Sequence, residues 1–314
     1  MAPVNDLDLL PSPAWDLLPM NKYKAHHWQT WNSGMNQNGF AVLYTSLGCP
    51  FSCDFCSVNV VYGAHKQRLR SIDKVVEDIY NLVNKYNIKY IEIIDDTFTV
   101  NKKRVIELCK EIDYNGLGNK IHMWCFARAN TMTKELAHNM KKAGIDWVFM
   151  GFESGSDEIL GNVNKRQTIE QIKKAVDIAR PEGLLVGGNY VFGLSGDTLN
   201  TMQQTLDLAK ELNTEYANFY INMAYPGTKL YNEAKEKGYP LPKKWSQYGF
   251  FTPDAIPMRN ENLDYPEILK FRDNAFNEYF TSEKYLNHID EVFGSNVVKF
   301  IQTEITSKKI ERVL

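Results

Sequence analysis

Short apolar segments alternate with amphipathic ones six times along this chain. The apolar segments have the length and composition of buried strands, and they cover residues 41–46, 90–94, 121–126, 147–150, 185–192 and 217–223. The intervening segments place apolar residues at helical spacing, as in the stretch that follows Ser71, a candidate N-cap. Strands joined by helices run parallel, through right-handed crossovers. The pattern therefore predicts an α/β fold with a parallel sheet.

Three of the five cysteines lie in one loop, GCPFSCDFC, directly after the first predicted strand. Cys49, Cys53 and Cys56 have C-x3-C-x2-C spacing, and clustered thiolates are typical metal ligands. A structural zinc site and a fully ligated iron–sulfur cluster each take four ligands. Three thiolates on a cubane would leave one iron open to bind a small molecule. The spacing alone also allows a zinc site completed by a distant histidine, or cysteines that are merely packed.

Polar residues follow several of the predicted strands at their carboxyl ends. Asp95 and Asp96 follow the second strand, Arg128 the third, and Glu153 and Ser154 the fourth. Parallel α/β folds build their ligand sites at this edge of the sheet. We therefore expect these side chains to contribute to one ligand site.

The cysteine loop, with Phe55 just before its third cysteine, resembles the signature of the radical S-adenosylmethionine (SAM) superfamily. The resemblance covers roughly residues 41 to 235 and implies a partial (βα)6 parallel barrel. It implies that Cys49, Cys53 and Cys56 hold a [4Fe–4S] cluster whose open iron binds SAM. It further implies that reductive cleavage of SAM yields a 5′-deoxyadenosyl radical, which abstracts hydrogen from a substrate.

The same resemblance implies roles for residues around the SAM molecule. Phe55 matches the position whose backbone contacts the adenine, and Asp95 and Asp96 fall where the family binds the SAM amino group. Arg128 can pair with the SAM carboxylate through two oxygens.

Two further stretches resemble SAM-binding parts of the family. Glu153 and Ser154 in GFESG resemble the motif that contacts the ribose, and Lys165 aligns with a basic residue common in the segment that follows. In the fifth-strand motif, Ser195 stands where the family usually has proline, and Asp197 where it has glutamate. The resemblance to this loop is therefore looser than to the others.

The DDTF and YPGT patterns resemble the subgroup of the family that often carries a cobalamin domain. Members of that subgroup methylate unactivated carbons or remodel rings and carbon skeletons. This chain begins only ~40 residues before the predicted barrel, too few for such a domain. The segment SPAWDLLPMNKY resembles the linker that follows one. Two interpretations follow: a barrel that works without cobalamin, or one half of a split or truncated system with a separate cobalamin-domain protein.

We predict an N-terminal arm over residues 1–38, a radical SAM barrel over 39–240, and a mostly helical C-terminal cap over 241–314. The resemblance implies a one-electron donor of the flavodoxin or ferredoxin type, and a substrate that is a small molecule or peptide. Cys109 and Cys125 lack a C-x2-C partner and read as small buried residues. Two spare cysteines cannot ligate a second cluster, which argues against methylthiotransferases. The alternative is a non-catalytic iron–sulfur or zinc binding module.

Composition supports a protein of the reducing cytoplasm. The net charge is −2 over 314 residues, so bulk charge gives no reason to expect nucleic acid or an anionic membrane as partner. No apolar run reaches the ~20 residues of a membrane span. The N-terminus lacks the basic start and apolar core of a signal peptide, and five cysteines with three in one loop do not form a disulfide framework.

Overall fold

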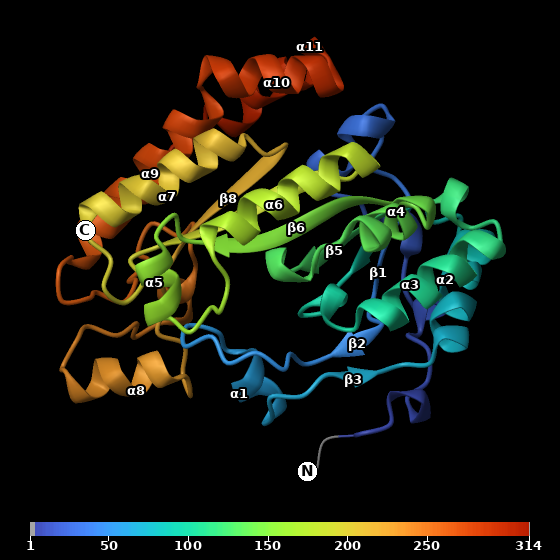
Figure 1. The fold of residues 1–314 in the computed structure, drawn as a ribbon, viewed down its shortest axis with the longest axis horizontal. Coiled ribbons are helices and arrows are strands. Elements are labelled where there is room, and N and C mark those ends of the chain that lie inside the picture. The colour runs from blue at the N-terminus through green and yellow to red at the C-terminus, as the bar shows by residue number, and fades with distance from the viewer. Residues whose placement is uncertain (1–3, 314) are drawn as a thin grey trace. The chain divides into compact units, whose positions relative to one another are not determined.

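Six strands form one sheet in the order β1-β4-β5-β6-β7-β8 in the computed structural model, which describes residues 4–313 (Figure 1). β1 pairs with β4, β4 with β5, and β5 with β6, each in parallel. The strands are β1 (Phe40–Leu43), β4 (Tyr90–Ile93), β5 (His122–Ala127), β6 (Ile145–Glu153), β7 (Leu185–Phe192) and β8 (Tyr216–Ile221). The predicted α/β class with a parallel sheet is confirmed. A separate antiparallel pair, β2 (Ser46–Leu47) with β3 (Arg68–Leu69), flanks the cysteine loop in the sequence.

Helices follow the strands as the alternation predicts. They are α1 (Val58–Tyr62), α2 (Ile72–Tyr86), α3 (Lys102–Tyr114), α4 (Lys134–Lys142), α5 (Asp157–Asn162), α6 (Ile169–Ala179), α7 (Leu199–Leu212), α8 (Lys229–Glu236), α9 (Tyr265–Phe280), α10 (Glu283–Phe293) and α11 (Ser295–Phe300). Ser71 caps α2, accepting a hydrogen bond from the Lys74 backbone N–H. Thr168 and Gln171 form a capping box before α6. Among the described residues, no helix is both long and apolar enough to cross a bilayer.

The chain divides into two compact units. Unit 1 contains the described residues up to Pro50, together with Tyr62–Gly151 and Lys173–Gly187. Unit 2 contains Phe51–Val61, Phe152–Ile172 and the described residues from Gly188 onward. Within unit 1, α3 packs against α2 and α4 (Figure 1). Within unit 2, α9 packs against α7 and β8.

The N-terminal arm packs onto strands of unit 1 through aromatic side chains. The ring of Trp28 lies 5.0 Å from that of Trp124 on β5 and 4.6 Å from that of Phe149 on β6. A β-bulge between β5 and β6 leaves Asp146 of β6 without an opposing residue on β5. The Asp146 carboxylate accepts hydrogen bonds from Asn32 in the arm and from His122 on β5. The arm is thus fastened by both apolar and polar contacts.

Some predicted ends of strands and helices differ from the observed ones, because backbone groups there leave the regular hydrogen-bond pattern of the element. The first strand was expected over residues 41–46, but β1 ends at Leu43, since Thr45 and Ser46 turn to donate to a buried carboxylate. In the C-terminal part, α10 ends at Phe293, and Gly294, at a φ of 85°, separates it from α11. The short helices α1, α5 and α8 were not predicted.

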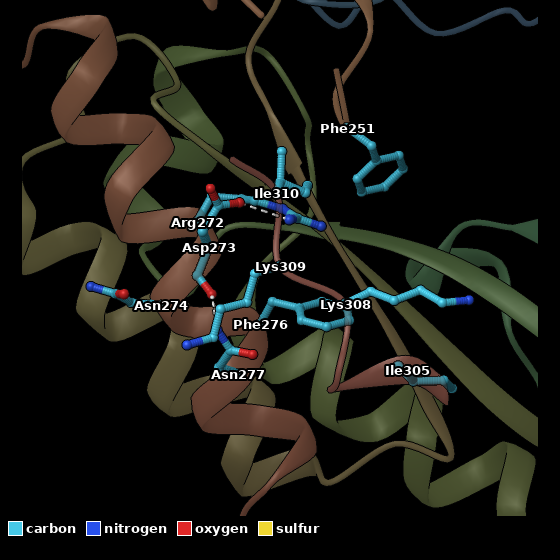
Figure 2. Close-up of a pocket in the computed structure, with 10 residues that line it drawn as sticks. All are labelled: Phe251, Arg272, Asp273, Asn274, Phe276, Asn277, Ile305, Lys308, Lys309 and Ile310. Atoms are coloured by element: carbon cyan, nitrogen blue, oxygen red, sulfur yellow. Dashed lines mark hydrogen bonds and ion pairs between the residues drawn. The ribbon is translucent and has the colours of Figure 1, made fainter. Parts of the chain in front are cut away.

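The C-terminal extension is mostly helical, as predicted. α9 begins with a capping box in which Glu267 accepts from the Asp264 backbone N–H. Asp273 on this helix is paired with two guanidinium groups, those of Arg272 and of Arg312 in the C-terminal tail. Figure 2 shows Arg272 and Asp273 at the edge of a cavity of about 380 Å³, which α9, Phe251 and the tail line. The Arg312 contacts therefore hold the tail as one wall of this cavity.

Candidate functional site

Asp95 of unit 1 follows β4, and both oxygens of its carboxylate accept hydrogen bonds inside the protein. Its carboxylate accepts hydrogen bonds from the backbone N–H groups of Thr45 and Ser46, at 2.6 and 3.0 Å, and from the hydroxyls of the same two residues. The side chain is buried. Burial raises the pKa of Asp95, and the four hydrogen bonds act in the opposite direction. Asp95 therefore anchors the segment that leads from β1 into the cysteine loop.

Asp96 has a different environment from its neighbour. One carboxylate oxygen, Oδ2, accepts from the Gly48 backbone N–H at 2.8 Å, directly before Cys49. The Cys49 sulfur lies 3.6 Å from the hydroxyl of Thr97. Burial raises the pKa of Asp96, although the side chain remains partly exposed. Asp96 thus lies beside the first predicted cluster ligand and keeps Oδ1 without a hydrogen bond from the described residues.

Two residues that the sequence did not single out support this corner of unit 1. Gln67 donates to the Ser46 hydroxyl at 3.0 Å and to the Thr97 carbonyl at 3.1 Å. Arg104 of α3 donates to the Thr45 carbonyl at 3.2 Å. Both side chains come from segments outside the predicted motifs, so only their position in the fold reveals them.

Arg128 follows β5, at the same edge of the sheet as Asp95 and Asp96. Its backbone N–H donates to the Thr99 hydroxyl, and its Nε to the Asn130 side chain, each at 3.4 Å. The residue is only 4% exposed. β4 and β5 are parallel neighbours, so their carboxyl ends deliver these charged residues to one edge, as predicted.

The second part of the cysteine loop belongs to unit 2 and is held by packing. Phe55 packs against two apolar clusters, one that includes Val163 and Leu194 and another that includes Leu230 and Met258. The Cys56 backbone N–H donates to the Cys53 carbonyl at 3.1 Å, which closes a tight turn. The aromatic side chain before the third cysteine therefore anchors the loop that carries Cys53 and Cys56.

Glu153, at the end of β6, forms a buried ion pair with Lys165. The Lys165 Nζ lies 2.5 Å from the Glu153 Oε1, and both side chains are less than a tenth exposed. Glu153 has a φ of 65°, a backbone conformation that non-glycine residues rarely adopt. Strained residues of this kind concentrate at functional sites. The sequence placed both residues near a SAM site, whereas the ion pair between them appears only in the structure.

Ser154 and Gly155 fasten the end of β6 to α7 in unit 2. The Gly155 backbone N–H donates to the Thr205 hydroxyl at 2.9 Å, and the Ser154 hydroxyl lies 3.3 Å from the same oxygen. A Cβ at Gly155 would lie 2.2 Å from the Gln204 carbonyl oxygen. The GFESG motif therefore contains a glycine that a close backbone approach requires.

None of the five cysteines forms a disulfide within the described residues, and they divide into two kinds. Cys49, Cys53 and Cys56 are partly exposed, while Cys109 and Cys125 are buried. Burial raises the pKa of Cys109 to about 12 and that of Cys125 well above its usual value. Within residues 4–313, no group of three or more His, Cys, Asp and Glu side chains is placed to hold a metal ion.

Comparison with known proteins identifies the family. The model of the radical SAM superfamily matches residues 43–209, more than half of the chain. An uncharacterized methyltransferase of Pyrococcus horikoshii is 35% identical over 290 residues, which are 92% of this chain and 59% of that protein. The anaerobic magnesium-protoporphyrin IX monomethyl ester cyclase of Rubrivivax gelatinosus is 28% identical over 91% of this chain and 49% of its own length. The chain thus spans about half the length of these relatives.

Solved structures agree at the level of the fold. The radical SAM methyltransferase TsrM from Kitasatospora setae, solved with cobalamin and a [4Fe–4S] cluster, matches with a TM-score of 0.59 at 20% identity. The match covers 65% of this chain and 39% of that one. Proteins of the matched family use a [4Fe–4S] cluster and SAM. From the motif, the parallel sheet and the family match together, we conclude that this chain belongs to the radical SAM superfamily.

Proposed function

We propose that this protein is a radical SAM enzyme that modifies a carbon centre of an organic substrate, by methylation or by ring or carbon-skeleton remodelling. The observation that carries this proposal is the loop with three partly exposed cysteines at C-x3-C-x2-C spacing, since three thiolates suit a cluster with one open iron. Two relatives, one named as a methyltransferase and one as a cyclase, support the two reaction types. Because the chain spans only part of the length of these relatives, the reaction of the complete protein is likewise a proposal.

Cys49, Cys53 and Cys56 would hold the [4Fe–4S] cluster as thiolates. When bound, the cluster and SAM would supply one-electron cleavage of SAM and a 5′-deoxyadenosyl radical. The protein's own residues would bind and orient SAM. An electron donor of the flavodoxin or ferredoxin type would be required. The reducing cytoplasm suits thiolate ligands of this kind.

For the SAM amino group we propose Asp96 rather than Asp95 as the acceptor. Asp95 already accepts four hydrogen bonds, whereas Asp96 has one oxygen without a described partner. Arg128 would pair with the SAM carboxylate, because a guanidinium matches two oxygens. Glu153 and Ser154 would accept from the ribose hydroxyls, and the Phe55 backbone would contact the adenine.

Lys165 would act through Glu153. Its ammonium group donates to one Glu153 oxygen, Oε1, and so would hold the carboxylate in a fixed orientation towards the ribose. Cobalamin, if the reaction uses it, would come from a separate cobalamin-domain protein or from the part of a longer chain that these residues do not represent. The substrate would be a small molecule or a peptide.

The test is an anaerobic reconstitution with iron and sulfide, followed by SAM and dithionite. We expect 5′-deoxyadenosine to form, and the assay is run with and without added cobalamin. Cys53→Ala should lose the visible absorption of the cluster, while the matched variant Cys109→Ala, outside the loop, should keep it. A full cluster in Cys53→Ala would contradict the ligand assignment.

A second pair of variants tests the SAM contacts. Glu153→Gln should weaken SAM binding by roughly ten- to a hundredfold, with iron content unchanged, because loss of a charged acceptor costs roughly 1.5–3 kcal/mol. Glu158→Gln, exposed on α5, is the control and should bind SAM like the parent protein. Equal SAM affinity in all three proteins would remove Glu153 from the ribose role.

A further inference from the structure

Glu92 lies within β4, between two buried isoleucines. Its neighbours Ile91 and Ile93 are buried, at 0% and 1% exposure. Side chains alternate along a strand, so Glu92 points to the other face. In register it lies between Val42 of β1 and Trp124 of β5, both uncharged. Glu92 is therefore an acidic residue between two uncharged neighbours in unit 1. We call Val42, Glu92 and Trp124 the Glu92 row.

Neither polar group of this row is satisfied within the protein. The Glu92 carboxylate is partly buried and makes no hydrogen bond or ion pair with any described residue. The Trp124 indole N–H is buried and likewise has no hydrogen-bond partner among the described residues. A buried N–H of this kind typically costs roughly 1–3 kcal/mol of stability. An unpaired N–H beside a partly buried carboxylate without a described partner, on paired residues, points to a bound molecule that contacts both.

No charge on the neighbouring strands compensates Glu92. The ionisable side chains nearest in the register, His122 and Asp146, are hydrogen-bonded to each other at 2.5 Å, and Asp146 also accepts from Lys141. Burial is the cause that raises the pKa of Glu92 to about 7. The carboxyl group therefore changes its charge near neutral pH, which is typical of groups at functional sites.

The surface around Glu92 is apolar and open in part. Val42 on β1 and Ile94, just beyond β4, are each 42% exposed. Trp28 of the arm covers the adjoining Trp124 from one side, at a ring separation of 5.0 Å. Glu92 and Asp96, the proposed SAM contact, are four positions apart, roughly 13 Å along an extended chain. The Glu92 row thus lies within the reach of one organic molecule from the proposed SAM contacts.

We infer that Glu92 and Trp124 form the polar recognition pair for the substrate, a molecule with an apolar body that carries a protonated amine. The ammonium would donate to the Glu92 carboxylate, and an acceptor atom of the same molecule would receive the Trp124 N–H. The exposed apolar side chains of Val42 and Ile94 would contact its hydrocarbon part. This inference names the substrate class for the proposed function and rests on it.

The experiment measures binding of two probes of similar size to the reconstituted, SAM-loaded protein by calorimetry at pH 8. The probes are 2-naphthylmethylamine, which is a cation, and 2-naphthylacetate, which is an anion. We expect the parent protein to bind the amine at least tenfold more tightly than the acetate. Glu92→Gln should reduce this preference to less than threefold, while Glu107→Gln, exposed on α3, should retain it.

The pH dependence gives an independent signature. For an acceptor that ionises near pH 7, the affinity for the amine should fall about tenfold from pH 8 to pH 6 in the parent protein. Glu92→Gln should show no such fall. Trp124→Phe should weaken binding of the amine without abolishing the preference for it.

Two outcomes would overturn the inference: equal binding of both probes by the parent protein, or the same preference in Glu92→Gln. Absence of binding by either probe would also contradict the substrate class. Formation of 5′-deoxyadenosine from SAM is measured in the same proteins and should be equal in the parent protein and the control Glu107→Gln. Failure of that reaction in the parent protein would count against the proposed function, whereas the binding preference would still be measurable.

Discussion

Asp95 and Asp96 are adjacent in the sequence, but their carboxylates have different surroundings. Asp95 collects four hydrogen bonds from Thr45 and Ser46, and Asp96 receives one from Gly48. A buried acceptor with four donors contributes to the fold, because removing it leaves all four donors unpaired. At the residue scale, one acid therefore has a structural role, and the other is available for a ligand.

Alanine substitution should separate these two roles. Asp95→Ala should lower the free energy of unfolding by about 3–5 kcal/mol, since it leaves two backbone N–H groups and two hydroxyls without their acceptor. Asp96→Ala should lower it by about 1 kcal/mol and should weaken SAM binding more than it weakens the fold. Urea unfolding of the cluster-free chains measures the first effect, and calorimetry with SAM measures the second. Equal destabilisation by both variants would contradict this division.

Glu92 should make stability depend on pH in a direction that can be tested. Its pKa is raised from 4.5 to about 7 in the folded protein, so the folded chain binds this proton more tightly than the unfolded chain does. Protonation of Glu92 therefore adds to the free energy of unfolding. This contribution is fully present below about pH 4.5 and is lost as the pH rises through 7.

Glu92→Gln should remove this part of the pH dependence. Relative to the variant, the parent protein should lose roughly 1–3 kcal/mol of unfolding free energy between pH 5 and pH 8, allowing for partial exposure of the group. Urea unfolding at four pH values gives the difference and cancels the contributions of other acids, such as Asp197. Parallel curves for the two proteins would contradict the prediction.

At the scale of elements, the loops at the strand ends are held by contacts within each unit. Phe55 anchors the loop of Cys53 and Cys56 among apolar side chains. Gly155 brings the end of β6 against the backbone of α7 at Gln204. These contacts place the proposed ligand groups on rigid elements, which is what a preorganised site requires.

Gly155 and Gly161 form a matched pair for this argument. Gly155→Ala should lower the free energy of unfolding by about 2–3 kcal/mol, because a Cβ there meets the Gln204 carbonyl oxygen at 2.2 Å and the backbone must shift. Gly161→Ala in α5 meets nothing within 4 Å and should be neutral or stabilising by up to about 1 kcal/mol. Thermal and urea unfolding measure both. Similar losses for the two variants would argue against the close approach at Gly155.

At the scale of the whole molecule, three thiols should be accessible to an alkylating reagent and two should be protected from it. Cys49, Cys53 and Cys56 are partly exposed, whereas burial keeps Cys109 and Cys125 protonated and out of reach of solvent. Iodoacetamide at pH 8 should therefore add three adducts to the folded, cluster-free chain and five to the chain in guanidinium, as counted by mass spectrometry.

Cluster reconstitution provides the control for this experiment. Ligation of the three loop thiolates should reduce the count for the folded chain from three adducts to none. Labelling of Cys109 or Cys125 in the folded chain would contradict their burial. Continued labelling of the loop in a fully reconstituted protein would contradict the ligand assignment.

The sequence alone determined the α/β class, the positions of most strands and helices, and the three-cysteine motif that identifies the family. These features are local: strand and helix periods, caps such as Ser71, and the spacing of Cys49, Cys53 and Cys56 can be read from neighbouring residues. Element ends were less predictable. β1 ends early because Thr45 and Ser46 bond to a carboxylate 50 and 49 positions away.

Only the tertiary structure decided what each polar residue does. The sequence treated Asp95 and Asp96 alike, and the fold gave them different partners. It paired Glu153 with Lys165 across 12 positions, and it left Glu92, in the YIEII strand, without a hydrogen-bond or ion-pair partner among residues 4–313. A side chain's role depends on the groups that face it, and those groups come from other strands and helices. Sequence spacing can predict where such a residue lies, but not which donors and acceptors surround it.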